Sequence, residues 1–522
     1  MLRTFHAVAL SLVLLILAAC TNTAAVRSES GLKLNLSAKD KEGYVVLKVV
    51  TLRPISLLNP NWKSIKISSS SNQSEMEDIM PPYGMLMGKH IPTESLYFAK
   101  LNAGEYDITG FGSSGPDGVG WVIKALYSDL ASVKQKLHFT VQAGHLANLG
   151  TIVYAPKIEN ENPEKIFLLN GSMGKKSAYN TLIYELQQSG ISLEEGGGWD
   201  TNTTPEAEAE VLSAARPFVS LLTFSKSSNG LEAGSNLGLI FRRVGPQSWS
   251  SESINTLGRI YSIGKTLDGK VVVGSDYGEY FVQAKSRTWS SFRVGQEKGR
   301  IIHIEPRADG SAIFITGDLL KTRVWFKKSL EDDFGLSTEI VKTDGPPDNL
   351  LVTDDELILA GNIPGFTRET VISRINKKTL SVTSKKENFW VIDWQYMQDR
   401  TVNLTRMNGL SLYSSTWENN GTTWKHSDNP VVLSYWPDRQ HGVSIKFSAG
   451  FTMVSNQLQI TSDGGKTWAQ TGKPLDTRDF AGRIVFADDN EIMVQGSNML
   501  YSTRDKGQTW QRIFPPESTI SR

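Results

Sequence analysis

Cysteine is almost missing from this chain, because only one of its 522 residues is a cysteine. A single thiol cannot form an internal disulfide, so packing alone must hold the fold together. Zinc sites that need two or more cysteines are excluded for the same reason. An excess of one charge is also missing, with 55 Lys and Arg against 54 Asp and Glu. No long-range basic field can therefore gather nucleic acid, and we expect no nucleic-acid partner.

Glycine and tryptophan are abundant instead, at 45 and 13 residues. Hydrophobic residues make up 39% of the chain and charged residues 21%, which is typical of folded rather than disordered proteins. The chain is too long for one compact domain, so we expect at least two folded units.

The first twenty residues have the pattern of a targeting signal. A short basic start, Met1-Leu2-Arg3, precedes an apolar run from Ala7 to Leu17. This run has the length of a signal-peptide core and is too short to span a bilayer. The lone cysteine, Cys20, follows directly in Leu17-Ala18-Ala19-Cys20. A plain secretory signal with a chance cysteine is the alternative.

The string that ends at Cys20 resembles the lipobox of bacterial lipoproteins. The resemblance implies that residues 1–19 are removed, that Cys20 is lipidated, and that residues 20–30 form a tether to the membrane. Processing would leave acidic and basic residues equal in number, because residues 1–19 contain one arginine and no acid. Thr21 stands where an Asp would favour the inner membrane. The resemblance therefore implies a lipid-anchored protein of the bacterial cell envelope, at the outer membrane in a Gram-negative cell.

Residues 31–155 show the alternation of short β-strands. Several short strands in so few residues predict an antiparallel β-sandwich. The pattern Leu101-x-x-Gly104-x-Tyr106 resembles the tyrosine corner of immunoglobulin-like domains, which implies that the Tyr106 hydroxyl bonds back to the backbone. The predicted strands lie at 44–50, 64–67, 95–99, 105–108, 137–141 and 151–154.

Residues 156–216 are predicted to be a short helical connector. Apolar residues at helical spacing predict one helix over 177–186. Gly196-Gly197-Gly198 is interpreted as a hinge. A second helix is expected to start with Thr204 as its N-cap and Pro205 at its first position.

An octet of the form [S/T]-x-D-x-G-x-T-W recurs in the last part of the chain. It occurs at 461–468 and at 503–510, and a near match with Asn419 in place of Asp occurs at 417–424. Ser248-Trp249 and Thr288-Trp289 keep only its last two positions. The structural positions of the three octets are Asn419, Gly421, Trp424, Asp463, Gly465, Thr467, Trp468, Asp505, Gly507, Thr509 and Trp510.

The chemistry of the octet suits a tight hairpin. A carboxylate or carboxamide accepts hydrogen bonds from turn amides, glycine supplies positive φ, and threonine adds a hydroxyl. A repeat of about 40–46 residues with four strands is typical of a β-propeller blade. Residues 217–522 therefore predict a propeller of about seven blades, with six or eight as alternatives.

The octets resemble the Asp-box, or bacterial neuraminidase repeat, of sialidases, some glucanases, sortilin-type receptors and a photosystem assembly factor. The resemblance implies that Asp463 and Asp505 brace peripheral turns and are not catalytic. Calcium binding at Asp463-Gly464-Gly465 is a weaker alternative, because no EF-hand loop follows.

Enzymatic signatures are sparse. Sialidases with this repeat carry an F/Y-R-I-P motif, and the nearest string here is Phe241-Arg242-Arg243-Val244. No serine-hydrolase elbow, zincin helix or P-loop string occurs in the sequence. We expect no catalytic residue, no metal site and no cofactor, and we do not expect sialidase activity.

Two aromatic and polar segments between the octets suggest a recognition surface. Their residues are Trp394, Tyr396, Tyr435, Trp436 and Arg439, and packing of these aromatics between blades is the favoured interpretation. The sequence thus favours a membrane-anchored, non-enzymatic binding or assembly scaffold for an envelope protein or a glycan. The alternative is a carbohydrate-active glycoside hydrolase, which needs two carboxylates across a cleft.

Overall fold

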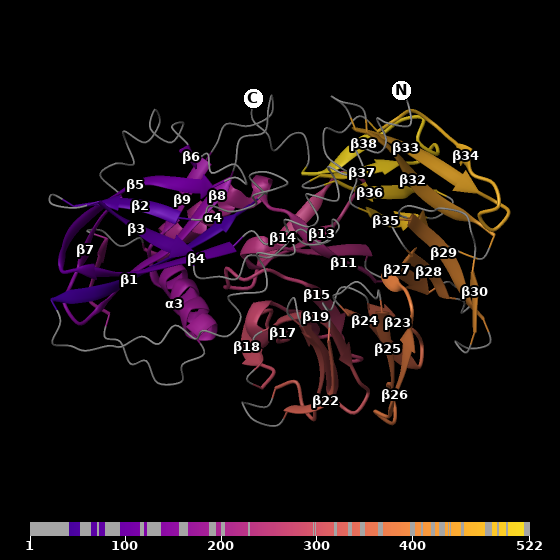
Figure 1. Cartoon of the computed structure of the whole chain (residues 1–522), viewed down its shortest axis with the longest axis horizontal. Helices are drawn as coiled ribbons and strands as arrows, with labels where there is room; N and C mark the ends of the chain where they lie inside the picture. The colour runs from indigo at the N-terminus through magenta and orange to yellow at the C-terminus, as the bar shows by residue number, and fades with distance from the viewer. Residues whose placement is uncertain are drawn as a thin grey trace. The chain divides into compact units, whose positions relative to one another are not determined.

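The protein forms two compact units, residues 1–215 and 216–522, which are considered one at a time (Figure 1). The computed structural model describes part of each unit. The described residues are 41–52, 64–69, 73–78, 94–114, 120–122, 137–155, 165–186, 195–199, 204–227, 230–295, 297, 299–317, 321–331, 337–344, 350–363, 369–396, 402–408, 411–418, 423–426, 434–436, 438, 440–449, 454–475, 483–487, 490–496 and 499–515. The predicted signal, Cys20 and the tether lie outside this set.

The first unit is built on one ten-stranded sheet with the order β10-β7-β5-β2-β3-β4-β1-β8-β9, and β6 pairs with β5 beside this path. All six predicted strand segments are strands, so this part of the prediction is confirmed. The strands are β1 Glu42–Thr51, β2 Ser64–Ser68, β3 Gln73–Asp78, β4 Glu94–Asn102, β5 Gly104–Ser114, β6 Gly120–Val122, β7 His138–Val141, β8 Leu146–Ala155, β9 Lys165–Leu169 and β10 Gly197–Trp199.

The central strand β1 is buried on both faces. Val45, Leu47 and Val49 point into a core shared with β2, β4, β5, β7, β8 and β10. On the opposite face, Tyr44 and Val46 pack under the helix α3 (Ser172–Leu186). Alternate side chains of a strand point to opposite faces, so the near-continuous apolar run of β1 serves two cores.

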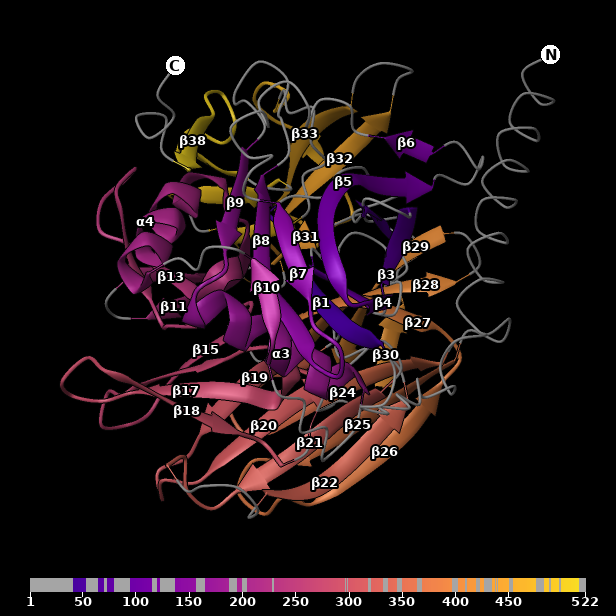
Figure 2. The same ribbon diagram turned by 90° about the vertical axis from the view of Figure 1, so that its left-hand side faces the viewer.

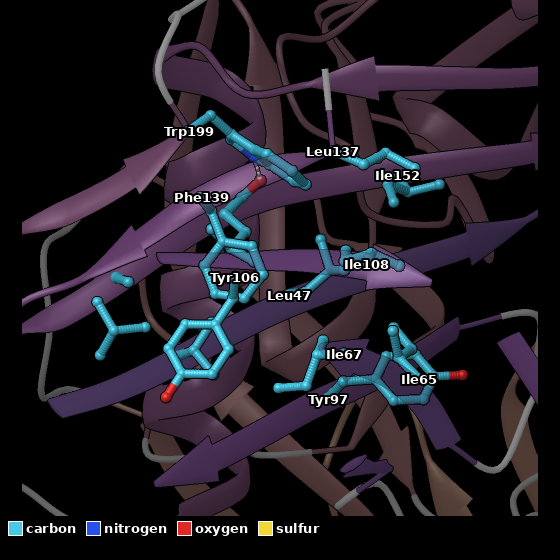
Figure 3. Close-up of a cluster of buried hydrophobic side chains, with 14 of the residues drawn as sticks. Leu47, Ile65, Ile67, Tyr97, Tyr106, Ile108, Leu137, Phe139, Ile152 and Trp199 are labelled. Atoms are coloured by element: carbon cyan, nitrogen blue, oxygen red, sulfur yellow. Dashed lines mark hydrogen bonds between the residues drawn. The ribbon is translucent and has the colours of Figure 1, made fainter. Parts of the chain in front are cut away.

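Aromatic residues join the strands of the first core (Figure 3). The Tyr106 hydroxyl donates to the Asn102 carbonyl at 2.9 Å, as the predicted corner requires. Its ring stacks on Phe139, which meets Trp199 edge-on. The Trp199 indole donates to the Leu149 carbonyl at 2.5 Å. Burial raises the pKa of Tyr106 above its ordinary value.

The predicted connector is wrong as a separate element. Strand β9, helix α3 and strand β10 belong to the first unit, and α4 (Pro205–Ala215) ends it. The predicted hinge forms most of β10, where Gly197 pairs with Val141 of β7. A Cβ on Gly197 would lie 2.2 Å from the Thr140 carbonyl, so these glycines permit close strand approach. The start of α4 is confirmed, since the Ala207 amide bonds to Thr204 Oγ1 at 3.3 Å.

The predicted purely antiparallel sandwich also needs correction. The strands form one continuous sheet, and β1 pairs with β8 in parallel while pairing with β4 in antiparallel fashion. An isolated bridge joins Leu146 to Glu195 beside β10. The sheet therefore curls around its own core, because β10 and β7 at one end of the strand order contact β8 near the other end.

The second unit is a seven-bladed propeller, so the predicted blade count is confirmed. Each blade is a four-stranded antiparallel sheet whose strands follow chain order. Blades 1 to 3 contain β11 Leu221–Ser227, β12 Gly230–Ser235, β13 Leu239–Arg243 and β14 Trp249–Ser253; β15 Ser262–Lys265, β16 Val271–Gly274, β17 Glu279–Gln283 and β18 Trp289–Arg293; β19 Arg300–Pro306, β20 Ala312–Gly317, β21 Lys321–Lys327 and β22 Ser337–Asp344.

Blades 4 to 7 repeat this arrangement. They contain β23 Leu350–Val352, β24 Glu356–Ile363, β25 Glu369–Asn376 and β26 Val382–Glu387; β27 Trp390–Tyr396, β28 Val402–Asn408, β29 Ser411–Glu418 and β30 Thr423–His426; β31 Ser434–Tyr435, β32 Gly442–Ala449, β33 Val454–Thr461 and β34 Ala469–Gln470; β35 Arg483–Ala487, β36 Ile492–Gln495, β37 Leu500–Thr503 and β38 Gln511–Phe514. The 3-10 turn η3 Arg216–Phe218 follows α4, whereas η4 Asn236–Gly238 and η5 Asp276–Gly278 follow the second strands of blades 1 and 2.

The sheets follow one another in a ring, and in Figure 2 the yellow β38 returns toward the magenta β13. Side-chain hydrogen bonds join every neighbouring pair of blades. From the junction of blades 1 and 2 onward, they are Trp289 to Glu252, Tyr280 to Leu330, Lys377 to Glu305, Asn362 to Val391, Gln395 to Trp436, Thr471 to Lys506, and Gln495 to Leu221. Each blade is made of consecutive strands, so side chains rather than a shared strand close the ring.

Candidate functional site: outer hairpins and inter-blade seams

The hairpins between the third and fourth strands of blades 6 and 7 contain the two complete octets. In blade 7, Thr503 Oγ1 donates to Asp505 Oδ1 at 2.8 Å and accepts from the Gly507 amide at 2.8 Å. The Asp505 carboxylate then accepts from the Thr509 amide at 2.9 Å and the Thr509 hydroxyl at 2.6 Å. Gly507 has φ of 87°, which favours glycine. Thr503, Asp505 and Thr509, the polar positions of the octet pattern, therefore all take part in closing one turn.

The blade 6 hairpin repeats these contacts. Asp463 accepts from the Thr467 amide at 3.0 Å and from the Thr467 hydroxyl at 2.6 Å. The hydrogen bond from the Thr467 side chain is the main reason that the pKa of Asp463 falls to about 2, and Thr509 lowers the pKa of Asp505 to about 2 in the same way. Both carboxylates are ionised near neutral pH, and these hydrogen bonds come from their own turns.

Trp510, which follows the blade 7 turn, contacts the preceding blade, whereas Trp468 meets Trp436 of its own blade. The Trp510 indole donates to the Lys473 carbonyl beyond β34 at 3.2 Å. Trp249 and Trp289, which lack the acidic part of the octet, donate likewise to the Ile513 carbonyl and to Glu252 Oε1, both at 2.8 Å. In blades 1, 2 and 7, the tryptophan near the start of the fourth strand therefore donates a hydrogen bond across the seam, the boundary between two neighbouring blades.

Two of the predicted recognition residues are packing residues instead. Trp394 and Trp436 are buried, at 8% and 5% exposure. The Trp436 ring meets Trp468 edge-on at 5.5 Å, and its indole donates to Ser434 Oγ at 2.9 Å. Gln395 clamps the backbone of Trp436, accepting from its amide at 2.6 Å and donating to its carbonyl at 2.7 Å. These two positions therefore follow the packing interpretation, because Trp394 lies in a core formed by blades 4 and 5 and Trp436 packs on Trp468 of blade 6.

The remaining predicted residues are placed in part. Tyr435 in β31 is half-buried against Phe486 of blade 7. Tyr396 and Trp424 lie in β27 and β30, but their side chains are outside the described set. Arg439, Asn419 and Gly421 also lie outside the described residues. Tyr435 packs against the same hydrophobic cluster as Trp510 of the blade 7 octet.

A charged cluster that sequence reasoning missed lies between blades 2 and 3. Glu297 is fully buried, and its carboxylate accepts from the Gly299 amide at 2.7 Å and from Thr316 Oγ1 at 2.7 Å. Arg323 approaches both oxygens at 2.8 and 3.0 Å, and the Trp325 indole donates at 3.0 Å. Burial works to raise the pKa of Glu297, but these hydrogen bonds together lower it below its ordinary value. A lone Glu in a loop carries no sequence signal for such a network.

A second buried pair repeats this logic between blades 1 and 2. Asp276 in η5 accepts from the Arg259 amide at 2.9 Å and from its guanidinium at 2.8 and 3.2 Å. The guanidinium also lies over the Tyr261 ring at 5.3 Å, and Arg300 lies over the same ring at 5.4 Å. A sequence signal for Asp276 does exist. Ser275-Asp276 in blade 2 and Ser235-Asn236 in blade 1 both lie at the end of the second strand of their blade, so a polar residue repeats at this turn.

No group of three or more His, Cys, Asp or Glu side chains in the part of the chain that the structure describes is arranged to hold a metal ion. Of the helices in the described ranges, none combines the length and apolarity needed to cross a bilayer.

The comparisons with known proteins find likeness in solved structures only. No family model and no curated protein matches the chain. The structure titled YCF48 bound to D1 peptide matches with 14% identity and a TM-score of 0.40, over 53% of this chain and 89% of that one. The Niastella koreensis GH74 enzyme matches with 13% identity and a TM-score of 0.39, over 56% and 53%. A polysaccharide lyase of family PL25, an ulvan lyase, matches with 9% identity and a TM-score of 0.36, over 57% and 95%. Likeness this distant assigns the chain to no family.

Proposed function

We propose that this chain is a lipid-anchored protein of the bacterial envelope whose propeller is a non-enzymatic binding or assembly scaffold. An envelope protein or a glycan is the expected ligand. The anchor rests on the sequence, in which the single cysteine ends the string Leu17-Ala18-Ala19-Cys20. Under the sorting rule of bacterial lipoproteins, Thr21 favours the outer membrane if the cell is Gram-negative.

The observation that carries the scaffold proposal is that several described carboxylates of the propeller make structural contacts that lower their pKa. Among the described residues, the Asp463 and Asp505 carboxylates accept hydrogen bonds within their turns, and Glu305 and Glu491 pair with cations of a neighbouring blade. Glu305, for example, is drawn below its ordinary pKa by His303 and Lys377 against the opposing effect of burial. A general acid in glycoside hydrolysis needs a raised pKa instead. The described propeller carboxylates with lowered pKa are Asp268, Glu297, Glu305, Asp309, Asp438, Asp463, Glu491 and Asp505.

The anchor is tested by Cys20→Ser in cells fed a labelled palmitate precursor. We expect loss of the lipid label, because serine lacks the sulfur that carries the acyl-glycerol group. Thr23→Ser in the tether is the matched control and should keep wild-type labelling. Unchanged labelling of Cys20→Ser would overturn the anchor.

The scaffold is tested with the chain from Thr21 onward, which retains every described residue. Purified protein is incubated with a panel of envelope polysaccharides, and both bound sugar and newly formed chain ends are measured. We expect saturable binding of a ligand without new ends. The release of ends at catalytic rates would overturn the scaffold and favour the hydrolase, which requires two carboxyl groups about 5–10 Å apart across a cleft.

A further inference from the structure

The turn that leads from β9 into α3 is held by a carboxylate from another helix. Glu208 of α4 is 1% exposed. Its Oε1 accepts from the Gly171 amide at 3.1 Å and the Gly174 amide at 3.0 Å. Its Oε2 accepts from the Met173 amide at 3.0 Å. The carboxylate therefore occupies the amino-terminal end of α3, where free amides and the helix dipole favour a negative charge.

The same turn is tightly fitted on its other sides. Thr151 Oγ1 donates to the Gly174 carbonyl at 2.9 Å, and Asn148 donates to the Lys175 carbonyl at 3.0 Å. A Cβ on Gly174 would lie within 2 Å of the Leu169 carbonyl. These contacts hold the backbone of the turn in place, and with it the amides that bind the Glu208 carboxylate.

Helix α4 has few other attachments. Its buried residues are Glu208, Leu212 and Ala215, while Glu206 and Glu210 are exposed. No lysine or arginine in the described part of the first unit pairs with Glu208, and three backbone amides bind its two carboxylate oxygens. An unpaired buried carboxylate is costly, and one that leaves its amides would also leave them unsatisfied. The three hydrogen bonds are therefore expected to form and break together, whereas an apolar contact of the same size can loosen gradually.

We propose that Glu208 is a latch that fixes α4 on the first unit. The chain passes into the propeller directly after α4, at Arg216. While the latch is closed, α4 moves as part of the first unit, and the chain can change direction only after Ala215. When it opens, α4 and the turn at 171–174 are released together.

The latch is tested by hydrogen exchange on the chain from Thr21 onward. In Glu208→Gln, which keeps the shape but loses the charge, we expect the 171–174 amides and those of α4 to exchange about tenfold faster or more. Glu206→Gln and Glu210→Gln on the same helix should exchange like wild type. Core amides of β1 and β8 should be unchanged in all three variants. Wild-type rates at 171–174 in Glu208→Gln would overturn the latch.

A measurement on the unaltered sequence decides the question if the variant unfolds. The latch requires that the 171–174 amides and the amides of α4 open in one event, with equal opening constants across denaturant concentrations. Release of α4 while the turn stays protected would contradict the proposal.

A spin-label distance between positions 176 and 210 gives a second readout, because the chain from Thr21 has no native cysteine. We expect one narrow distance that broadens in Glu208→Gln.

Discussion

The outer hairpins of blade 1 and blade 7 both need hydrogen-bond partners for the polar groups of their turns, and they supply them with opposite chemistry. In blade 7 an acceptor, Asp505, gathers the donors of its turn. In blade 1 a donor, Arg243, gathers carbonyls, with bonds to Pro246 at 2.8 and 3.2 Å and to Gly245 at 3.2 Å. The same guanidinium forms two bonds of 2.9 Å to Glu491 of blade 7. The Asp-centred turn is thus one way to close a blade hairpin, and the Arg-centred turn also closes the ring.

What stays constant between the two hairpins is the tryptophan. Trp249 after the Arg-centred turn and Trp510 after the Asp-centred turn both donate to a carbonyl of the preceding blade. The Trp249 ring also meets Phe514 of blade 7 edge-on at 5.6 Å. The comparison indicates that the seam contact is the shared requirement and that the chemistry of the turn can vary.

The largest expected effect comes from Arg243→Gln. The pair with Glu491 is mostly buried, at 12% and 13% exposure, and removing Arg243 takes away two bonds to a charged group that keeps Ser502 and Arg504 as neighbours. We expect a loss of about 2–3 kcal/mol in the free energy of unfolding, measured by denaturant titration. Arg287→Gln in the exposed hairpin of blade 2 is the control and should change it by less than about 0.5 kcal/mol. Equal effects of the two variants would remove the special role of the blade 1 turn.

Trp249→Phe and Trp510→Phe test whether the seam contact is shared. Each removes the indole donor and leaves a carbonyl of the neighbouring blade without it. We expect both to lower the free energy of unfolding by about 1–2 kcal/mol, with the larger loss at the less exposed Trp249 bond. A neutral Trp249→Phe beside a destabilising Trp510→Phe would restrict the seam role to Asp-centred blades.

The smallest effect is the pH dependence of the Asp-centred turns. The pKa of Asp505 is about 2 in the folded chain, below the ordinary value of about 3.9. A lowered pKa adds stability above about pH 4, and this contribution is lost as the pH falls toward 2. The thermal midpoint of Asp505→Asn should therefore lie below that of wild type at pH 5 and approach it near pH 2. A difference that is constant over this range would contradict the assigned role.

Much of the fold could be predicted because local chemistry repeats. The six alternating segments of the first unit and the seven-blade count follow from period and turn residues. Strand β3, Gln73–Asp78, was missed because its residues are polar and only pairing with β2 and β4 makes it a strand. Strand β10 was missed because glycine in an unpaired chain indicates flexibility, whereas here it permits close approach to β7.

The aromatic segments show where prediction stops. Trp394 and Trp436 have the composition of a recognition surface, but both are buried. Burial depends on what the neighbouring blade places opposite them, and Gln395 is the residue that fixes Trp436. A sequence without its neighbours in space cannot separate a packed ring from a presented one.

The amino-acid sequence by itself determined the turns. Asp505, Gly507 and Thr509 make contacts within a few residues, so their spacing alone carries the geometry. The tertiary structure decided the seams and the latch. Arg243 meets Glu491 across 248 residues, and Glu208 meets the start of α3 across 34 to 37. Such partners are chosen by the folding of whole sheets and helices, which brings distant charges together in places where burial makes an unpaired charge costly.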